Sequence, residues 1–192
     1  LLEDYAERLD DTGKNYLQRV RAATQKMGVL IDDLLRLSRV TRAEMHRELI
    51  DLSQLAGSIA AELSVAQPER QAEFRIAPGL KAEGDARLIR VVLQNLLENS
   101  WKFTSRREHA LIEFGQSHSD GKAAFFVKDN GAGFDPAHAG GLFGAFQRLH
   151  SVADFPGTGI GLATVQRILR RHGGQVWATG AVNAGATIFF TI

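Results

Sequence analysis

The chain has 192 residues, which corresponds to one ordinary domain with an additional segment, and its 44% hydrophobic and 23% charged residues exclude a disordered chain. The net charge of +1 argues against a nucleic-acid or membrane-surface binder, and the absence of cysteine excludes disulfides and thiolate metal sites. There is neither an apolar run of membrane-spanning length nor a signal peptide, so we expect a soluble, cytoplasmic chain. Because it begins with Leu1, we also expect a fragment of something longer.

The first part of the sequence predicts a helical hairpin with a short first arm. Residues 1–9 have the character of a helix end, and Asp10-Asp11-Thr12-Gly13 predicts a turn with helix-capping residues. Residues 14–47 then carry an apolar stripe broad enough for one face of a helical bundle. At about 1.5 Å per residue this helix is far longer than residues 1–9 can cover. We expect that most of the first arm lies outside this chain, or that another chain covers the stripe.

The rest of the sequence alternates helices and strands. Helices are predicted at residues 51–67, 84–103 and 161–171, and strands at residues 72–76, 80–83, 111–115, 123–128, 176–179 and 187–192. Residues 136–156 are rich in glycine and lack a clean period, which is typical of functional lids or mobile loops. The predicted fold class is therefore α+β: a long helix followed by an α/β sandwich whose mixed sheet packs on helices.

Two stretches combine polar side chains with buried elements. In the first, Asn95, Asn99 and Lys102 share one helical face beside Phe103, so that amide oxygens for Mg²⁺ and a cation for phosphate lie together. A solvated polar face would give the same pattern. In the second, Asp129-Asn130-Gly131-Ala132-Gly133-Phe134 follows an apolar strand. A carboxylate there suits a planar, donor-bearing ring, although Asp-Asn-Gly is also ordinary turn chemistry.

Two further stretches offer groups for an anion. In Leu142-Phe143-Gly144-Ala145-Phe146-Gln147-Arg148, two aromatic residues can anchor a lid and the arginine can meet phosphate, or the aromatic residues simply form a small cluster under a loop. Gly157-Thr158-Gly159-Ile160-Gly161-Leu162 opens a helix, where backbone N–H groups favour anions. No strand precedes it, which excludes a Rossmann dinucleotide fingerprint.

Taken together and in this order, the four stretches resemble the asparagine box, the first glycine box, the phenylalanine box and the second glycine box of sensor histidine kinases, within the wider family of Bergerat-fold ATP-binding proteins. The resemblance covers roughly residues 52–192, and residues 142–166 are most similar to kinases attached to phytochrome-like or PAS sensor modules. It implies a partial dimerisation and phosphotransfer hairpin at residues 1–47 and an ATP-binding catalytic domain at residues 48–192.

The resemblance also implies roles for individual positions. Asp129 would accept the adenine amino group, Asn99 would ligate Mg²⁺ with Asn95 nearby, and Lys102 and Arg148 would contact phosphates. Asn95, Lys102 and Arg148 are the implied catalytic positions. The other implied nucleotide-binding positions are Phe103, Gly131, Gly133, Gly157, Thr158, Gly159, Gly161, Leu162 and Thr187, the last as a support for Asp129.

The implied function is transfer of the γ-phosphoryl group of ATP to a histidine and then to an aspartate of a response regulator. The implied setting is a homodimer, formed through the helical hairpin, that carries an upstream sensor module, uses ATP and Mg²⁺, and has no nucleic-acid partner and no membrane contact in this segment. The sequence departs from the pattern in two ways. First, the chain has no phosphoacceptor histidine closely followed by an acidic residue. Its six histidines are scattered and have the character of surface, loop or helix-end residues: His46, His109, His118, His138, His150 and His172.

The second departure is Gly140-Gly141, where relatives often carry charged residues, and we expect it to loosen the lid. Two other functions remain open: an ATPase of the same fold, and a pseudokinase that binds nucleotide or acts as a scaffold. The long helix favours the kinase over the ATPase, and truncation explains the missing histidine better than loss of activity does.

Overall fold

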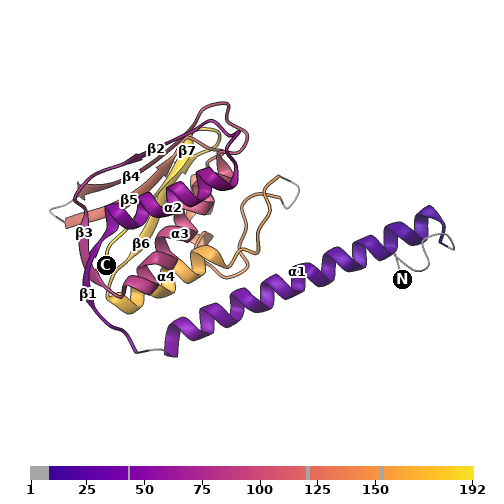
Figure 1. Ribbon diagram of the computed structural model, residues 1–192, viewed down its shortest axis with the longest axis horizontal. Helices are drawn as coiled ribbons and strands as arrows, with labels where there is room; N and C mark the ends of the chain where they lie inside the picture. Colours follow the sequence, from indigo (N-terminus) through magenta and orange to yellow (C-terminus); the bar gives the residue numbers. More distant parts are fainter. Residues whose placement is uncertain (1–8, 43, 120–121, 152–153) are drawn as a thin grey trace.

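The structure, a computed structural model, describes residues 9–42, 44–119, 122–151 and 154–192. Figure 1 shows a long helix, α1, that extends away from an α/β sandwich. The predicted fold class is confirmed, because three helices lie on a mixed sheet. The part of the first hairpin arm that was expected within this chain, residues 1–9, lies outside the described residues except for residue 9.

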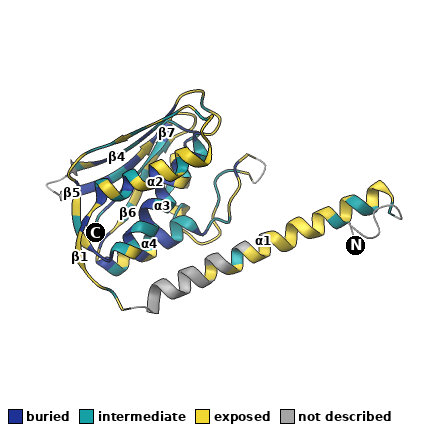
Figure 2. Cartoon of the chain, in the orientation of Figure 1, coloured by how far each residue is buried: buried dark blue, intermediate teal, exposed yellow. Residues whose placement is uncertain are grey.

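Helix α1 (Asp11–Arg42) begins within the predicted turn, where the Asp10 carboxylate accepts a hydrogen bond from the Gly13 N–H at 2.7 Å. It ends five residues before the predicted limit, Arg47. Figure 2 shows that most of its described length is exposed. The large apolar side chains exposed along it are Tyr16, Val20, Met27, Ile31 and Leu34. In the part of the chain that the structure describes, no helix has both the length and the apolar character needed to cross a membrane.

The main sheet has the strand order β2-β4-β5-β7-β6. Strands β2 and β4 are parallel and the other neighbours are antiparallel, so the sheet is mixed as predicted. The bounds are β2 (Ala72–Ile76), β4 (Ala110–Ser119), β5 (Lys122–Asp129), β6 (Val176–Ala181) and β7 (Gly185–Phe190). A separate pair joins β1 (Glu48–Asp51) to β3 (Lys81–Gly84), and β1 was not predicted because four residues are too few to show a period.

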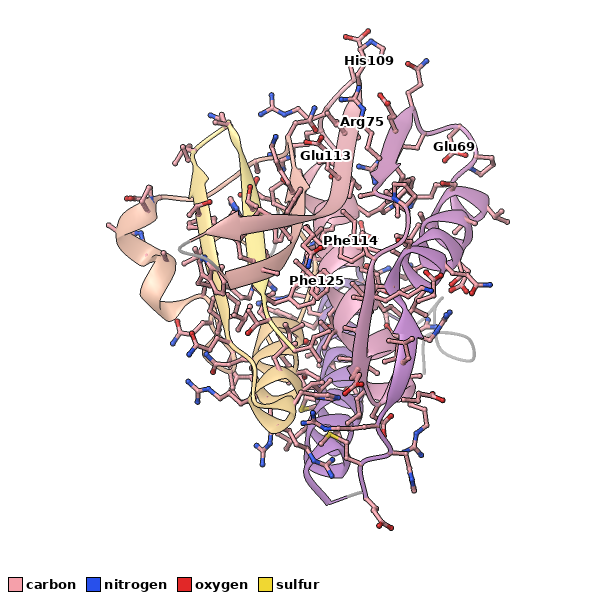
Figure 3. The ribbon with its side chains drawn as sticks, turned by 90° about the vertical axis from the view of Figure 1, so that its left-hand side faces the viewer. Glu69, Arg75, His109, Glu113, Phe114 and Phe125 are labelled. Atoms are coloured by element: carbon pink, nitrogen blue, oxygen red, sulfur yellow. The ribbon has the colours of Figure 1, made fainter. Side chains whose placement is uncertain are left out.

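Helices α2 (Leu52–Ala66), α3 (Ala86–Phe103) and α4 (Gly161–His172) cover one face of the main sheet (Figure 1). The core lies between the helices and the sheet and includes Phe114 and Phe125 (Figure 3). Phe190, from β7, also belongs to the core and stacks on Phe114 at 6.5 Å between ring centroids. Aspartates begin two of the helices, as predicted: Asp51 accepts from the Gln54 N–H, and Asp85 accepts from the backbone N–H groups of Arg87 and Leu88. The short 3₁₀ helix η2 (Pro136–Gly141) lies in the irregular segment.

The linker after α1 is held by hydrogen bonds to Asp85, at the start of α3, and to His172, at the end of α4. His172 is only 3% exposed, and its Nε2 accepts a hydrogen bond from the Asp85 N–H at 3.0 Å. The Asp85 carboxylate accepts from the His46 N–H, and the Arg47 guanidinium donates to the His172 carbonyl at 2.8 Å. His172 therefore ends a helix as predicted, but as a buried residue, because it faces the Asp85 N–H.

Candidate functional site

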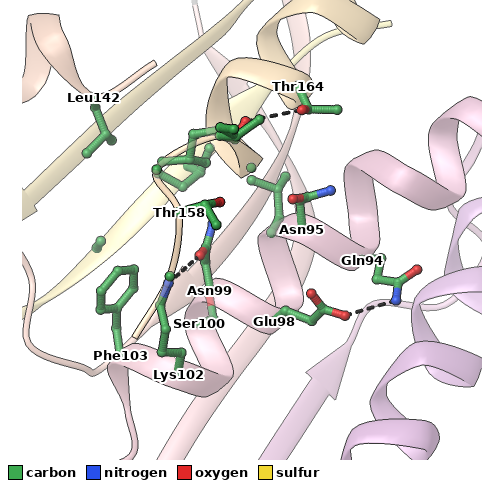
Figure 4. Close-up of a pocket in the computed structure, with 18 of the residues that line it drawn as sticks. Gln94, Asn95, Glu98, Asn99, Ser100, Lys102, Phe103, Leu142, Thr158 and Thr164 are labelled. Atoms are coloured by element: carbon green, nitrogen blue, oxygen red, sulfur yellow. Dashed lines mark hydrogen bonds between the residues drawn. The ribbon is translucent and has the colours of Figure 1, made fainter. Parts of the chain in front are cut away.

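A cavity of about 680 Å³ lies between α3, the loop after β5, the start of α4 and residues 142–151 and 154–160, which we call the lid segment. Figure 4 shows the side chains of Asn95, Asn99, Lys102 and Phe103 along the α3 side of this cavity, with Thr158 facing them from the lid segment. The four stretches singled out in the sequence thus meet at one place. The predicted site residues that line the cavity are Asn95, Asn99, Lys102, Phe103, Asp129, Gly133, Arg148, Gly157, Thr158, Gly159, Gly161 and Leu162.

Asp129, at the end of β5, is a buried carboxylate that lines the cavity and is only 8% exposed. It accepts hydrogen bonds from the Ser100 hydroxyl at 3.1 Å and the Gly131 N–H at 2.9 Å, with a longer contact from the Ala186 N–H. Burial raises the pKa of this carboxyl above its usual value, and the three donors oppose that shift. Each carboxylate oxygen has two lone pairs, so Asp129 retains acceptor capacity for a ligand.

The predicted contact between Thr187 and Asp129 is wrong by one residue. In the β5–β7 ladder Asp129 lies opposite Ala186, whereas Thr187 lies opposite Lys128. Neighbouring residues of a strand point to opposite faces of the sheet, so Thr187 faces away from the cavity. The backbone N–H of Ala186 is what supports Asp129.

The glycines after Asp129 serve the packing of the loop. A Cβ at Gly131 would lie 2.6 Å from the Phe103 carbonyl oxygen, and Gly131 does not line the cavity. Gly133 has a φ of +62°, and a side chain there would overlap the Ala181 carbonyl. A Cβ at either position would overlap the surrounding backbone, so both positions require glycine, and Gly133 but not Gly131 lines the cavity as predicted.

Two cations, Lys102 and Arg148, also line the cavity. Lys102 donates to the Asn99 amide oxygen at 3.0 Å, and burial, followed by the positive charge of Arg148, lowers the pKa of its ammonium group. Neither Lys102 nor Arg148 forms an ion pair with a carboxylate in the described residues. Partly buried cations without an anionic partner favour binding of an anion there.

Arg148 also has a structural role within the lid segment. Its guanidinium donates to the Phe155 carbonyl at 2.6 Å and to the Gly157 carbonyl. Two carbonyls on the same segment thereby hold the arginine in place. Arg148 contributes positive charge to the cavity from this position, since both guanidinium contacts are to neutral groups.

Asn95 is held by its own helix. Its Nδ2 donates to the Val91 carbonyl at 2.8 Å, and its Oδ1 lies where a Cβ on Gly161 would approach to 2.5 Å. Asn95 therefore packs α3 against the first turn of α4. The nearest acid along the helix, Glu98, accepts from the Gln94 side chain at 2.9 Å (Figure 4).

The start of α4 adds an electropositive helix end. Ile160 precedes the helix and provides no side-chain cap, so the first backbone N–H groups of α4 are available to an anion. Gly159 has a φ of +77° and packs against the backbone of Phe146 and Gln147, which requires a glycine at this turn.

The donor set fits Mg²⁺ only when phosphate supplies further oxygens. In the residues that the structure describes, no three His, Cys, Asp or Glu side chains come together as a metal site. The Asn99 amide oxygen lines the cavity, and Mg²⁺ in nucleotide sites takes one or two protein oxygens together with phosphates and water.

Two contributors to the site were not predicted. Ser100 lies on the buried face of α3 and donates to Asp129, and a serine within that apolar face was the available signal. His150, which was expected to be an ordinary loop histidine, lines the cavity between the rings of Phe103 and Phe155. Nothing in its local sequence indicates that position.

The chain is similar to several known proteins. The model of the family described as histidine kinase-, DNA gyrase B- and HSP90-like ATPases matches residues 84–192. Cyanobacterial phytochrome B of Nostoc sp. is 35% identical over 100% of this chain and 26% of its own length. The methanogenesis regulatory histidine kinase FilI of Methanothrix harundinacea is 33% identical over 100% of this chain and 22% of its own length. The chain thus spans about a quarter of the length of these relatives.

Among solved structures, full-length ShkA in complex with AMPPNP is similar with a TM-score of 0.70 and 28% identity, over 95% of this chain and 39% of that chain. The likeness covers the sandwich and reaches into the long helix, because 95% of the chain exceeds the sandwich alone.

Proposed function

This chain belongs to the family of histidine kinase-, DNA gyrase B- and HSP90-like ATPases, as a relative of the sensor histidine kinases, and we propose that it binds ATP with Mg²⁺ and transfers the γ-phosphoryl group to a histidine. Residues 48–192 would be the catalytic domain, and residues 1–47 part of the dimerisation hairpin. The observation that carries the proposal is the mixed lining of the cavity, which combines a buried carboxylate, Asp129, with the cations Lys102 and Arg148 and the α4 N-terminus.

These groups correspond to the two chemical parts of ATP, the base and the phosphates. The Asp129 carboxylate would accept the adenine amino group, and the hydrogen bonds from Ser100 and Gly131 hold that carboxylate in position. Lys102, Arg148 and the helix N-terminus would offset the charge of the phosphates. Asn99 would give an amide oxygen to Mg²⁺, which, when bound, supplies further positive charge to the phosphates.

In the proposed reaction an imidazole nitrogen attacks the γ-phosphorus. The new N–P bond forms as the bond from the γ-phosphorus to the bridging oxygen breaks, and ADP leaves with that oxygen. The proton of the attacking imidazole passes to a base or to water. Such transfer relies mainly on positioning and charge neutralisation, which this set of amide, cationic and backbone groups can provide.

The proposed setting is a cytoplasmic homodimer that contains an upstream sensor module and passes phosphate to the aspartate of a response-regulator receiver domain. The length of the relatives leaves room for such a module, because the chain covers only about a quarter of them. Helix α1 supports the dimer, since five large apolar side chains are exposed along it.

Phosphotransfer with labelled ATP tests the proposal. We expect no acid-labile phosphate on this chain alone, because none of its histidines has the acceptor pattern, and labelling of the histidine in a longer protein that includes the preceding helix. Stable phosphohistidine on any of the six histidines present, or an extended protein that binds ATP without any transfer, would contradict the assignment. The second outcome would favour a pseudokinase.

A further inference from the structure

His150 attaches the lid segment to the body of the domain. The His150 Nε2 lies 2.9 Å from the carbonyl oxygen of Gly133, in the loop that also carries Asp129. A carbonyl only accepts hydrogen bonds, so Nε2 carries a proton and donates. One hydrogen bond thus joins the lid segment to the loop that forms the purine end of the proposed site.

Aromatic packing fixes the orientation of the imidazole. Its ring centroid lies 5.3 Å from that of Phe103, at the end of α3, and 5.2 Å from that of Phe155. The Phe103 and Phe155 rings are themselves in edge contact at 5.1 Å, and Phe155 is only 4% exposed. Three rings from α3 and from two points of the lid segment therefore form one cluster, and His150 is its polar member.

The cluster also separates two cavities. The site cavity and a second cavity of about 360 Å³ share the side chains of Phe103, His150 and Phe155 as lining residues. The second cavity is otherwise lined by Arg106, Arg107, Ala132, Asp154, Val182 and Asn183. The cluster is therefore a wall that both cavities share.

The other attachments of this part of the lid segment are weaker or internal. Arg106 pairs with Asp154 at 2.8 Å, but both side chains are about half exposed or more, and such surface pairs contribute little. The contacts of Arg148 to the carbonyls of Phe155 and Gly157 join the segment to itself. The His150–Gly133 contact is half-buried and connects the segment to the domain, so we expect the position of the neighbouring lid residues to depend on it.

We propose that His150 is a positioning residue that fastens the lid segment to the Gly133 carbonyl and thereby holds Arg148 and the turn at Gly157–Gly159 in place for a phosphate chain. This inference rests on the proposed function for the nature of the ligand. His150 itself acts through the lid segment, since its proton is directed to Gly133 rather than into the phosphate end of the cavity.

The test compares His150→Phe, which retains a packed ring but has no donor, with His150→Gln, whose amide nitrogen can take the place of the imidazole Nε2. In the protein without nucleotide, we expect amide hydrogen exchange of residues 142–151 to accelerate in His150→Phe and to recover partly in His150→Gln. In calorimetry, we expect the ATP affinity of His150→Phe to fall by about 3- to 10-fold, the range of one lost hydrogen bond, while adenosine affinity stays unchanged. His138→Phe, at an exposed histidine of η2, is the matched control and should behave as wild type.

The outcomes separate this inference from the function on which it rests. If the wild type binds ATP but His150→Phe leaves both lid exchange and the ratio of ATP to adenosine affinity unchanged, the positioning role is wrong and the proposed function stands. If exchange is unchanged while ATP affinity falls, His150 contacts the nucleotide directly and the fastening is also wrong. If the wild type binds no ATP, the proposed function fails, and the exchange measurement still decides whether His150 fastens the segment.

Discussion

Burial of the Asp129 carboxylate costs the folded protein free energy, but it provides a hydrogen-bond acceptor for a ligand. Desolvation raises its pKa, so an Asn at this position would avoid the cost of a buried charge while keeping the hydrogen bond from Gly131. We therefore predict that Asp129→Asn melts at an equal or higher temperature than wild type, yet loses about tenfold or more in ATP affinity, because the amide presents a donor toward the adenine amino group. Thermal melts and calorimetry on the same samples measure both quantities.

The pH dependence of the stability difference between Asp129→Asn and wild type follows from the raised pKa of Asp129. A carboxyl whose folded pKa is raised destabilises the fold when it is ionised, and that penalty disappears as pH falls through the raised pKa. The stability advantage of Asp129→Asn should therefore shrink on acidification. Asp135→Asn, at an exposed aspartate that caps η2, is the control and should change neither ATP affinity nor this pH profile. A variant that melts lower than wild type and still binds ATP equally would contradict the role of Asp129.

The side chain at position 95 determines how fast bound ATP is hydrolysed when no acceptor histidine is present. ATPases of this fold resemble one another in having a glutamate one helical turn before the Mg²⁺-binding asparagine, and this chain has Asn95 there, bonded to the Val91 carbonyl. An amide is not a base at neutral pH, and general-base catalysis typically contributes about 10²–10⁴-fold. We predict that ATP is bound but hydrolysed far more slowly than about one turnover per second in a phosphate-release assay. Sustained turnover at that rate, abolished by Asp129→Asn, would favour the ATPase.

At the scale of elements, the caps of α3 and α4 connect the linker to the two helices that line the site. The Asp85 carboxylate caps α3 and accepts from the His46 N–H of the linker, and the Arg87 guanidinium beside it, together with these N–H donors, holds its pKa well below the usual range. We predict that Asp85→Ala lowers the free energy of unfolding by about 2 kcal/mol, the upper range for a cap, whereas Asp51→Ala, at an exposed cap, costs about 0.5–1 kcal/mol. Denaturant unfolding of the two variants measures the difference.

Acidification should remove the stabilisation that the Asp85 carboxylate provides. Because the folded pKa of Asp85 is depressed, its stabilisation is complete above the ordinary aspartate pKa of about 3.9 and is lost as pH falls below that value. The gap in stability between wild type and Asp85→Ala should therefore narrow on acidification below pH of about 4. An equal loss for Asp85→Ala and Asp51→Ala at neutral pH would contradict the special role of the buried cap.

Elements with local signals were predictable from the sequence. The sequence marked the start of α2 by Asp51, the start of α3 by Asp85 and the end of α4 by Gly173. These bounds were predictable because capping is a property of adjacent residues. Strand β1 and the support of Asp129 by Ala186 rather than Thr187 were not predictable, because the pairing of distant strands decides both.

The same distinction applies to the site. Its four stretches were recognisable as sequence patterns, and the structure brings them to one cavity. The contact of His150 with Gly133 joins residues 17 positions apart through the loop geometry, and the burial of His172 depends on Asp85 in another helix. Side chains of these residues could not be placed before the fold was known.

At the scale of the whole molecule, α1 has an apolar stripe that the described residues do not cover. Tyr16, Val20, Met27, Ile31 and Leu34 are each at least half exposed and recur at intervals of three, four or seven residues, which places them on one side of the helix. We predict concentration-dependent self-association in light scattering, which Ile31→Glu together with Leu34→Glu abolishes through burial of two charges in the interface.

Gln18→Glu together with Gln25→Glu is the matched control, because it adds the same two charges on the opposite side of the helix at exposed positions. This control should associate as wild type does. A wild type that remains monomeric at high concentration, or a control that dissociates equally, would contradict the assignment of the interface to the stripe.

The proposed function depends on Asp129 meeting the amino group of adenine in this cavity. Titration calorimetry of the wild-type protein with ATP and with purine riboside triphosphate, which lacks only that amino group, measures this contact directly. We predict binding of ATP with Mg²⁺ and an affinity for the analogue that is about tenfold lower or weaker still, because the buried carboxylate then loses its donor. Equal affinities for the two nucleotides, or no ATP binding at all, would contradict the proposed function.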